Sequence, residues 1–204
     1  MSSALKLLPL LLALGACSSV GTQFAKMSEP ESGERARVRV VANMLVKGVP
    51  ESDCLDWRKP GAGTIFGGMV GSSGYRGRSL NMPDPHNVSG SRRSAEFYVR
   101  AGKPLTLQLL NTPDSWQTCS LAISFVPQAG HNYEVAMITG QVDYQPDLGY
   151  CAARVFDLNS GRQIQAEETT SCRRRQRLEA RQRQREARRA ARAAQAERAA
   201  QTAQ

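Results

Sequence analysis

The chain has 204 residues, with 27 lysines and arginines against 18 aspartates and glutamates, a formal net charge of +9. This length is typical of one domain with appendages and argues against several large domains. The excess charge is local, because residues 18–172 carry fifteen basic and fifteen acidic side chains, whereas residues 173–204 carry eleven arginines and three glutamates. The domain itself is therefore close to neutral and is not predicted to have a basic surface.

Residues 1–17 have the organisation of an export signal. Lys6 precedes an apolar run at 7–13 that is well short of the ~20 residues needed to span a bilayer. The next residues, Leu14-Gly15-Ala16-Cys17, resemble the lipobox of bacterial lipoproteins. This resemblance implies that residues 1–16 are removed and that Cys17 carries diacylglycerol on its sulfur and a further acyl chain, such as palmitate, on its amino group. The alternative is an ordinary secretory signal, which would leave Cys17 as a plain thiol.

Residues 17–35 are rich in Ser, Glu, Pro and Gly and poor in apolar side chains. Such a segment buries too little surface to offset its ordering entropy, so we predict a disordered tether. Ser18 follows the lipidated cysteine where an aspartate would retain an enteric lipoprotein at the inner membrane. By that resemblance, the protein is expected at the outer membrane, anchored by lipid and facing the periplasm.

Residues 36–172 are predicted to form an all-β domain. Apolar and polar residues alternate in Arg37-Val38-Arg39-Val40 and onward toward Leu45 and Val46, which predicts a half-buried strand with its arginines facing water. The next region, residues 61–77, contains seven glycines. We interpret it as a glycine-rich strand and loop; the alternative, a membrane glycine zipper at Gly63, Gly67 and Gly71, has too few apolar neighbours to span a bilayer.

Three hairpins are predicted farther along the chain. Alternating segments at 95–100 and 105–109 flank the first Gly/Pro turn, and segments at 121–125 and 133–137 flank the second. The third hairpin is predicted around Asn159-Ser160-Gly161. About seven strands at this spacing favour an antiparallel two-layer β-sandwich, with the tether before it and a basic helix after it.

The residue patterns Phe125-Val126-Pro127-Gln128-Ala129-Gly130 and Tyr133-Glu134-Val135 lie within the second predicted hairpin. They resemble small β-sandwich modules of bacterial surface lipoproteins, the PEGA-like class and its uncharacterised relatives. The resemblance covers about residues 95–158. It implies a fold, and it brings no activity and no catalytic residues.

Four cysteines besides Cys17 remain, and an even number in an oxidising compartment predicts two disulfides. Three pairings are possible. The turn at Gly161 favours Cys151 with Cys172, which leaves Cys54 with Cys119. The sequence has no Cys-x-x-Cys motif, and neither histidine has a paired ligand at helical spacing, so no metal and no cofactor are expected.

Catalytic patterns are weak, since a nucleophile needs a base and an orienting group. The one cluster that suggests acid–base chemistry is His131 with Tyr133 and Glu134, although a turn histidine is usually just solvated. Trp57 and Trp116 each lie three residues from a cysteine, and they either line a ligand groove or cap the sandwich. The protein is therefore expected not to be an enzyme.

Residues 173–204 consist largely of Arg, Ala, Gln and Glu, which favour helix. Leu178 is the only large apolar side chain, too little for a coiled-coil seam, so we predict a solvated helical or disordered tail. Its expected partners are anionic lipid, lipopolysaccharide or cell-wall polymer, because an envelope location separates it from most nucleic acid. The predicted contacts are arginines, namely Arg173, Arg174, Arg175, Arg177, Arg181, Arg183, Arg185, Arg188, Arg189 and Arg192.

Two hypotheses of different class follow from the sequence. The first is a non-enzymatic lipid-anchored envelope protein whose domain binds or supports a partner and whose basic tail contacts anionic material. The alternative is an envelope enzyme, or an accessory subunit of one, that acts on cell-wall or glycan substrates. An open cleft containing His131 and Glu134 would favour the alternative.

Overall fold

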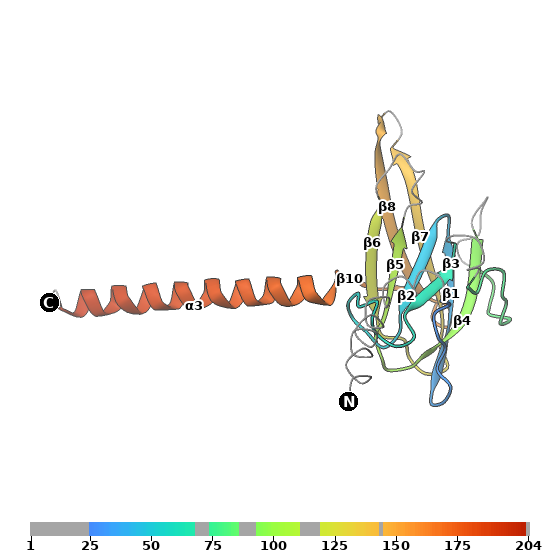
Figure 1. The fold of residues 1–204 in the computed structure, drawn as a ribbon, viewed down its shortest axis with the longest axis horizontal. Coiled ribbons are helices and arrows are strands. Elements are labelled where there is room, and N and C mark those ends of the chain that lie inside the picture. The colour runs from blue at the N-terminus through green and yellow to red at the C-terminus, as the bar shows by residue number, and fades with distance from the viewer. Residues whose placement is uncertain (1–24, 68–73, 86–92, 111–118, 143–144, 203–204) are drawn as a thin grey trace, which may run out of the picture. The chain divides into compact units, whose positions relative to one another are not determined.

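The computed structural model describes residues 25–67, 74–85, 93–110, 119–142 and 145–202. Within these ranges, ten strands precede one long helix, α3 (Cys172–Thr202) (Figure 1). The chain divides into two compact units, Met1–Thr169, which holds the strands, and Thr170–Gln204, which holds α3.

One sheet has five strands in the order β4-β1-β7-β8-β9. Its strands are β4 (Arg93–Arg100), β1 (Arg35–Ala42), β7 (Asn132–Val142), β8 (Gln145–Asp157) and β9 (Arg162–Ile164). The pairs are antiparallel except β1 with β7, which is parallel, with Val40 opposite Val135. The predicted fully antiparallel sandwich is therefore wrong at this pair.

The other sheet also has five strands, in the order β10-β6-β5-β2-β3, and all its pairs are antiparallel. Its strands are β10 (Glu167–Glu168), β6 (Ser120–Phe125), β5 (Leu105–Leu110), β2 (Leu45–Val49) and β3 (Gly63–Phe66). The strand count exceeds the expected seven in part because the segment after Gly161 divides into two short strands in different sheets, β9 and β10.

Residues from both sheets form a single hydrophobic core. Val38 and Phe97 from the first sheet and Leu107 and Ile123 from the second are all buried in it. Tyr75 stacks on Phe97 with the ring centroids 5.4 Å apart. Each such side chain contributes roughly 1.5–3 kcal/mol by leaving water. The arrangement is mostly β and fits a β-sandwich, as predicted from the sequence.

Two of the three predicted hairpins are wrong. The chain crosses from one sheet to the other between β4 and β5, and again between β6 and β7. The third hairpin is confirmed, because β8 pairs with β9 across the Asn159 turn. Alternation reveals which face of a strand is buried, but it does not reveal the strand's neighbour, and glycine turns serve sheet crossings as well as hairpins.

The predicted strand at 37–46 is likewise two strands in two sheets, β1 and β2. The expectation that the β1 arginines face water is wrong for Arg39, which is 6% exposed. Arg37 is half-buried, and only Arg35 is exposed.

The predicted tether extends to residue 35, but its last part packs on the domain. The side chain of Met27 is fully buried, and its N–H donates to the Thr64 carbonyl oxygen over 3.0 Å. A Cβ on Gly63 would come within 2.6 Å of the backbone of residues 25–27, so the close approach requires glycine there. The first part of the glycine-rich segment thus contains the strand β3, residues 74–77 form a turn, and residues 68–73 lie outside the described residues.

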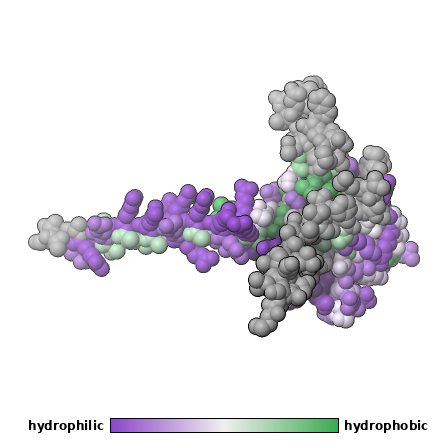
Figure 2. Space-filling model, in the orientation of Figure 1, coloured by the Kyte–Doolittle hydropathy of each residue, from purple (hydrophilic) through white to green (hydrophobic). Residues whose placement is uncertain are grey.

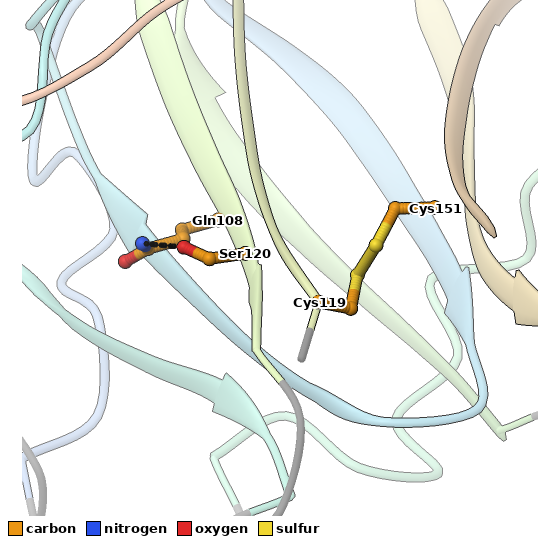
Figure 3. Close-up of a disulfide and its surroundings, with 4 residues drawn as sticks. All are labelled: Gln108, Cys119, Ser120 and Cys151. Atoms are coloured by element: carbon orange, nitrogen blue, oxygen red, sulfur yellow. Dashed lines mark hydrogen bonds between the residues drawn. A yellow bond between two sulfur atoms is a disulfide. The ribbon is translucent and has the colours of Figure 1, made fainter. Parts of the chain in front are cut away.

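A disulfide joins Cys119, immediately before β6, to Cys151 in β8, with the Cα atoms 6.0 Å apart (Figure 3). It therefore connects the two sheets. Cys54 and Cys172 are also disulfide-bonded, so the prediction that all four cysteines are oxidised is confirmed. Both predicted pairs are wrong, because β9 ends at Ile164 and the chain then joins the other sheet at β10, which ends the hairpin before Cys172.

Candidate functional site

Helix α3 begins at a well-formed cap. The Ser171 Oγ accepts a hydrogen bond from the Arg174 N–H at 3.2 Å, and the Ser171 carbonyl oxygen accepts one from the Arg175 N–H at 3.0 Å. Serine is among the best N-cap residues because its side chain satisfies an amide that the helix leaves unpaired. The helix spans 31 residues, which corresponds to a length of roughly 46 Å at 1.5 Å per residue.

Most of the arginines in α3 lie on one side of the helix. With 100° between successive residues, eight of them fall within an arc of about 160°. We call this set the arginine face; its members are Arg173, Arg174, Arg177, Arg181, Arg185, Arg188, Arg189 and Arg192. Figure 2 shows hydrophilic residues along the length of α3, interrupted by weakly hydrophobic patches.

The acidic residues lie on the other side of α3, where Glu179 pairs with two arginines outside the arginine face. Glu179 contacts Arg175 at 3.7 Å and Arg183 at 3.6 Å, both one turn away. Glu186 accepts a hydrogen bond from the Gln182 side-chain amide over 3.0 Å. Among the described residues, no member of the arginine face forms an ion pair, so its charge is balanced only by solvent and counterions.

Four members of the arginine face gather around one spot. Arg185, Arg188, Arg189 and Arg192 line a shallow hollow of about 270 Å³ on the helix surface. Like charges one turn apart repel by a few tenths of a kcal/mol per pair, and a bound anion would relieve this repulsion. Guanidinium groups donate in a fork that fits phosphate and carboxylate oxygens. The arrangement is suited to an anionic partner.

The cluster predicted for acid–base chemistry does not assemble into an open cleft. Glu134 is fully buried, and one of its carboxylate oxygens lies 3.2 Å from Arg39 Nη1. Arg39 also pairs with Glu96 at 2.7 Å. These residues occupy directly opposite positions on β4, β1 and β7. His131 instead contacts Asp157, with Nδ1 3.1 Å from Oδ2.

The backbone of residues 80–83 covers this buried triad of Arg39, Glu96 and Glu134. Arg39 donates to the Pro83 carbonyl oxygen over 2.9 Å, and the Leu80 N–H donates to Glu96. The triad therefore links three strands to a covering loop, and its geometry is that of a structural ion network.

Of the two tryptophans, Trp57 lies over Lys47, with the ammonium 4.4 Å from the ring centroid. Lys47 is 6% exposed, and burial lowers its pKa. Trp57 therefore covers a buried cation, which agrees with the capping interpretation. Trp116, His86 and the predicted lipidation site Cys17 lie outside the described residues.

Sequence reasoning missed a second group of charged residues on the domain. Arg35, Arg37, Tyr98 and His131 come together around one hollow on the first sheet. The sequence does contain a sign of this group. An arginine occupies every second position from 35 to 39, and a strand places such residues on one face.

Comparison with protein-family models, curated proteins and solved structures found no match. Among the described helices, none is long and apolar enough to cross a membrane. The described residues also contain no group of three or more His, Cys, Asp and Glu side chains arranged to hold a metal ion.

Proposed function

We propose that the protein is a non-enzymatic, lipid-anchored envelope protein whose arginine face binds anionic envelope material. The observation that carries this proposal is the segregation of charge along α3. Eight arginines share one side of the helix without a carboxylate partner among the described residues, while Glu179 neutralises arginines elsewhere. A helix that served only as a solvated spacer has no need for this segregation.

The lipid anchor is the other half of the proposal, and it is supported by the lipobox at Leu14-Gly15-Ala16-Cys17. Acylation of Cys17 would hold the chain at a membrane, where a basic segment gains about 1 kcal/mol per arginine near an anionic surface. The acyl chains would anchor only the N-terminal end of the chain, and the basic helix would add a separate, electrostatic attachment. The buried triad at Glu134 leaves the acid–base alternative without an accessible carboxylate at that residue.

The proposal is tested by removing the same number of charges from two sides of α3. One variant carries Arg185→Gln, Arg188→Gln and Arg192→Gln on the arginine face. The matched control carries Arg175→Gln, Arg183→Gln and Arg198→Gln, outside that face. Binding to vesicles containing phosphatidylglycerol, or to lipopolysaccharide, is measured by co-sedimentation at 0.1 M salt.

The first variant should lose about 3 kcal/mol, roughly a hundredfold in affinity. The control should lose tenfold or less, because Arg183 points away from the surface, Arg175 and Arg183 are already paired with Glu179, and only Arg198 lies near the edge of the arginine face. Equal losses would mean that net charge alone governs binding, and unchanged binding in both would refute the proposed contact. Separately, Cys17→Ser should move the protein out of the membrane fraction of cells.

A further inference from the structure

The outer surface of the first sheet carries a hollow of about 470 Å³ at the end where β1 and β7 begin. Its lining comes from three parts of the chain. Arg35 and Arg37 extend from β1, Tyr98 lies on β4 directly opposite Arg37, and His131 precedes β7. The hollow is large enough for a ligand the size of a monosaccharide derivative.

The two arginines in the hollow differ from their neighbours in charge balance. Arg39, Arg78 and Arg100 each pair with a glutamate at 2.6–2.8 Å. In the described part of the chain, Arg35 and Arg37 have no carboxylate partner, and no acidic residue lines the hollow. Two positive charges are thus concentrated there without an internal counterion.

Both guanidinium groups have a contact within the protein before any ligand binds. The Arg35 guanidinium carbon lies 4.8 Å from the centroid of the Tyr98 ring. Arg37 Nη1 donates to the Leu80 carbonyl oxygen over 3.0 Å. On the backbone, the Gly130 N–H donates to the Arg35 carbonyl oxygen at 3.0 Å. These contacts restrict the side chains and so lower the entropy lost when the two guanidinium groups bind an anion.

His131 adds a hydrogen-bonding group to the rim. Its Nδ1 contacts Asp157, which also accepts hydrogen bonds from the Asn159 N–H and the Ser160 hydroxyl, each at 3.0 Å. Burial by itself would raise the pKa of Asp157, but these hydrogen bonds outweigh it and the pKa is lowered, so the group is a carboxylate at neutral pH. Asp157 therefore engages Nδ1 of His131, which leaves Nε2 free to form a hydrogen bond with a ligand.

We propose that this hollow binds a small phosphate monoester of sugar-phosphate size, with the phosphate between Arg35 and Arg37 and a ligand hydroxyl hydrogen-bonded to His131 Nε2. A phosphate dianion matches the two arginine charges, whereas a carboxylate would leave one of them unbalanced. The site lies within the β unit, and the proposal depends neither on the lipid anchor nor on α3.

The test uses the full-length chain with Arg185→Gln, Arg188→Gln and Arg192→Gln, so that anions bound by α3 do not obscure the signal. Isothermal titration calorimetry compares glucose 1-phosphate, inorganic phosphate and methyl glucoside. Glucose 1-phosphate should bind saturably at millimolar concentrations, inorganic phosphate more weakly, and methyl glucoside not measurably. Equal binding of the two phosphates would overturn the assignment to a sugar phosphate, and absence of binding would overturn the site.

Two substitutions then locate the binding. Arg35→Gln changes an exposed side chain, and Arg37→Lys keeps the charge but removes the guanidinium fork; each should weaken glucose 1-phosphate binding about tenfold. Arg154→Gln, at an exposed arginine of β8 that does not line this hollow, is the matched control and should change the dissociation constant less than twofold. If all three variants behave alike, the ligand binds elsewhere and the proposal is wrong.

Discussion

Arg39 in β1 and Arg183 in α3 are both paired arginines, yet their partners are found at very different distances along the chain. Arg39 reaches Glu96 and Glu134, which are 57 and 95 residues away, and is 6% exposed. Arg183 reaches Glu179, four residues away, and its side chain is 79% exposed. The β unit is therefore held by long-range pairs that form only when it folds, whereas α3 is held by local pairs that any helix of this sequence makes.

This difference predicts that breaking a charge pair lowers the stability of the β unit much more than that of α3. A long-range buried pair leaves an uncompensated charge when one partner is lost, but a local exposed pair is replaced by water. Substitutions in the β unit should accordingly change the free energy of unfolding by several kcal/mol. Comparable substitutions in α3 should change it by a few tenths.

The largest effect is expected for Arg39→Met. Removal of the guanidinium leaves two carboxylates buried without their cation, so the free energy of unfolding should fall by about 3–5 kcal/mol. Urea denaturation followed by circular dichroism measures this change. Arg188→Met in α3 is the control and should stay within about 0.5 kcal/mol of the parent.

A compensating variant sharpens this first comparison. Combining Arg39→Met with Glu96→Leu and Glu134→Leu replaces the whole triad by apolar side chains and should restore part of the lost stability, because no buried charge remains but the Leu80 N–H and the Pro83 carbonyl oxygen lose their partners. If Arg39→Met changes the free energy of unfolding no more than Arg188→Met does, the triad is solvated in solution. The contrast between the two units then disappears.

The second-largest effect is expected for the disulfide. Replacing Cys119 and Cys151 with alanine opens a link between residues 32 apart and should lower the free energy of unfolding by about 2–4 kcal/mol. Because α3 is held locally, its helical signal should be unchanged in buffer. Non-reducing peptide mapping of the parent should recover Cys119 joined to Cys151, and a Cys54–Cys119 peptide would contradict the structure.

A smaller, pH-dependent effect is expected at Tyr75, whose hydroxyl donates to the Met27 carbonyl oxygen at 2.5 Å. Burial and the negative charge of Glu29 raise the pKa of Tyr75, and the positive charge of Arg78 lowers it. The net result is a pKa of about 12. The unfolded chain loses this proton near pH 10. The corresponding stability is therefore fully present below pH 10 and is lost as the pH rises from 10 to 12.

Tyr75→Phe should remove that alkaline loss and should lower the free energy of unfolding by about 1 kcal/mol at neutral pH, through the missing hydrogen bond. Urea denaturation of parent and variant at pH 8, 10 and 11 isolates the contribution of Tyr75 as a difference between the two curves. Parallel curves would show that Tyr75 ionises alike in the folded and unfolded states.

The same contrast explains which parts of the structure could be predicted from the sequence. Helix α3 was predictable because composition and i,i+4 spacing act within a few residues. Strand positions such as β1 and β6 were predictable in part, since alternation is also local. The sheet crossings, the parallel β1–β7 pair and the Cys119–Cys151 bond depend on contacts between distant segments, and nothing local distinguishes a crossing turn such as Ala101–Pro104 from a hairpin turn.

The burial of Arg39 was missed for a related reason. Alternating Arg and Val indicates which residues share a face, but it cannot indicate that residues 80–83 cover that face. Glu96 and Glu134 each occupied a polar position of a predicted strand, and only the register of β4, β1 and β7 brings them to Arg39. The hollow at Arg35 and Arg37 depends on the same register.

The smallest expected effect concerns α3 alone. Replacing Arg185, Arg188, Arg189 and Arg192 with glutamine keeps the helix propensity nearly constant and removes like-charge pairs three and four residues apart, each of which destabilises the helix by about 0.2–0.5 kcal/mol. Helicity at low salt should therefore rise slightly, while the unfolding of the β unit stays unchanged. Salt should remove the difference, since the Debye length falls from ~10 Å at 0.1 M to ~3 Å at 1 M. Circular dichroism at 222 nm across this range measures the effect, and a loss of β-unit stability in the variant would mean that the arginine face contributes to the fold of that unit and is not held ready for an anionic partner.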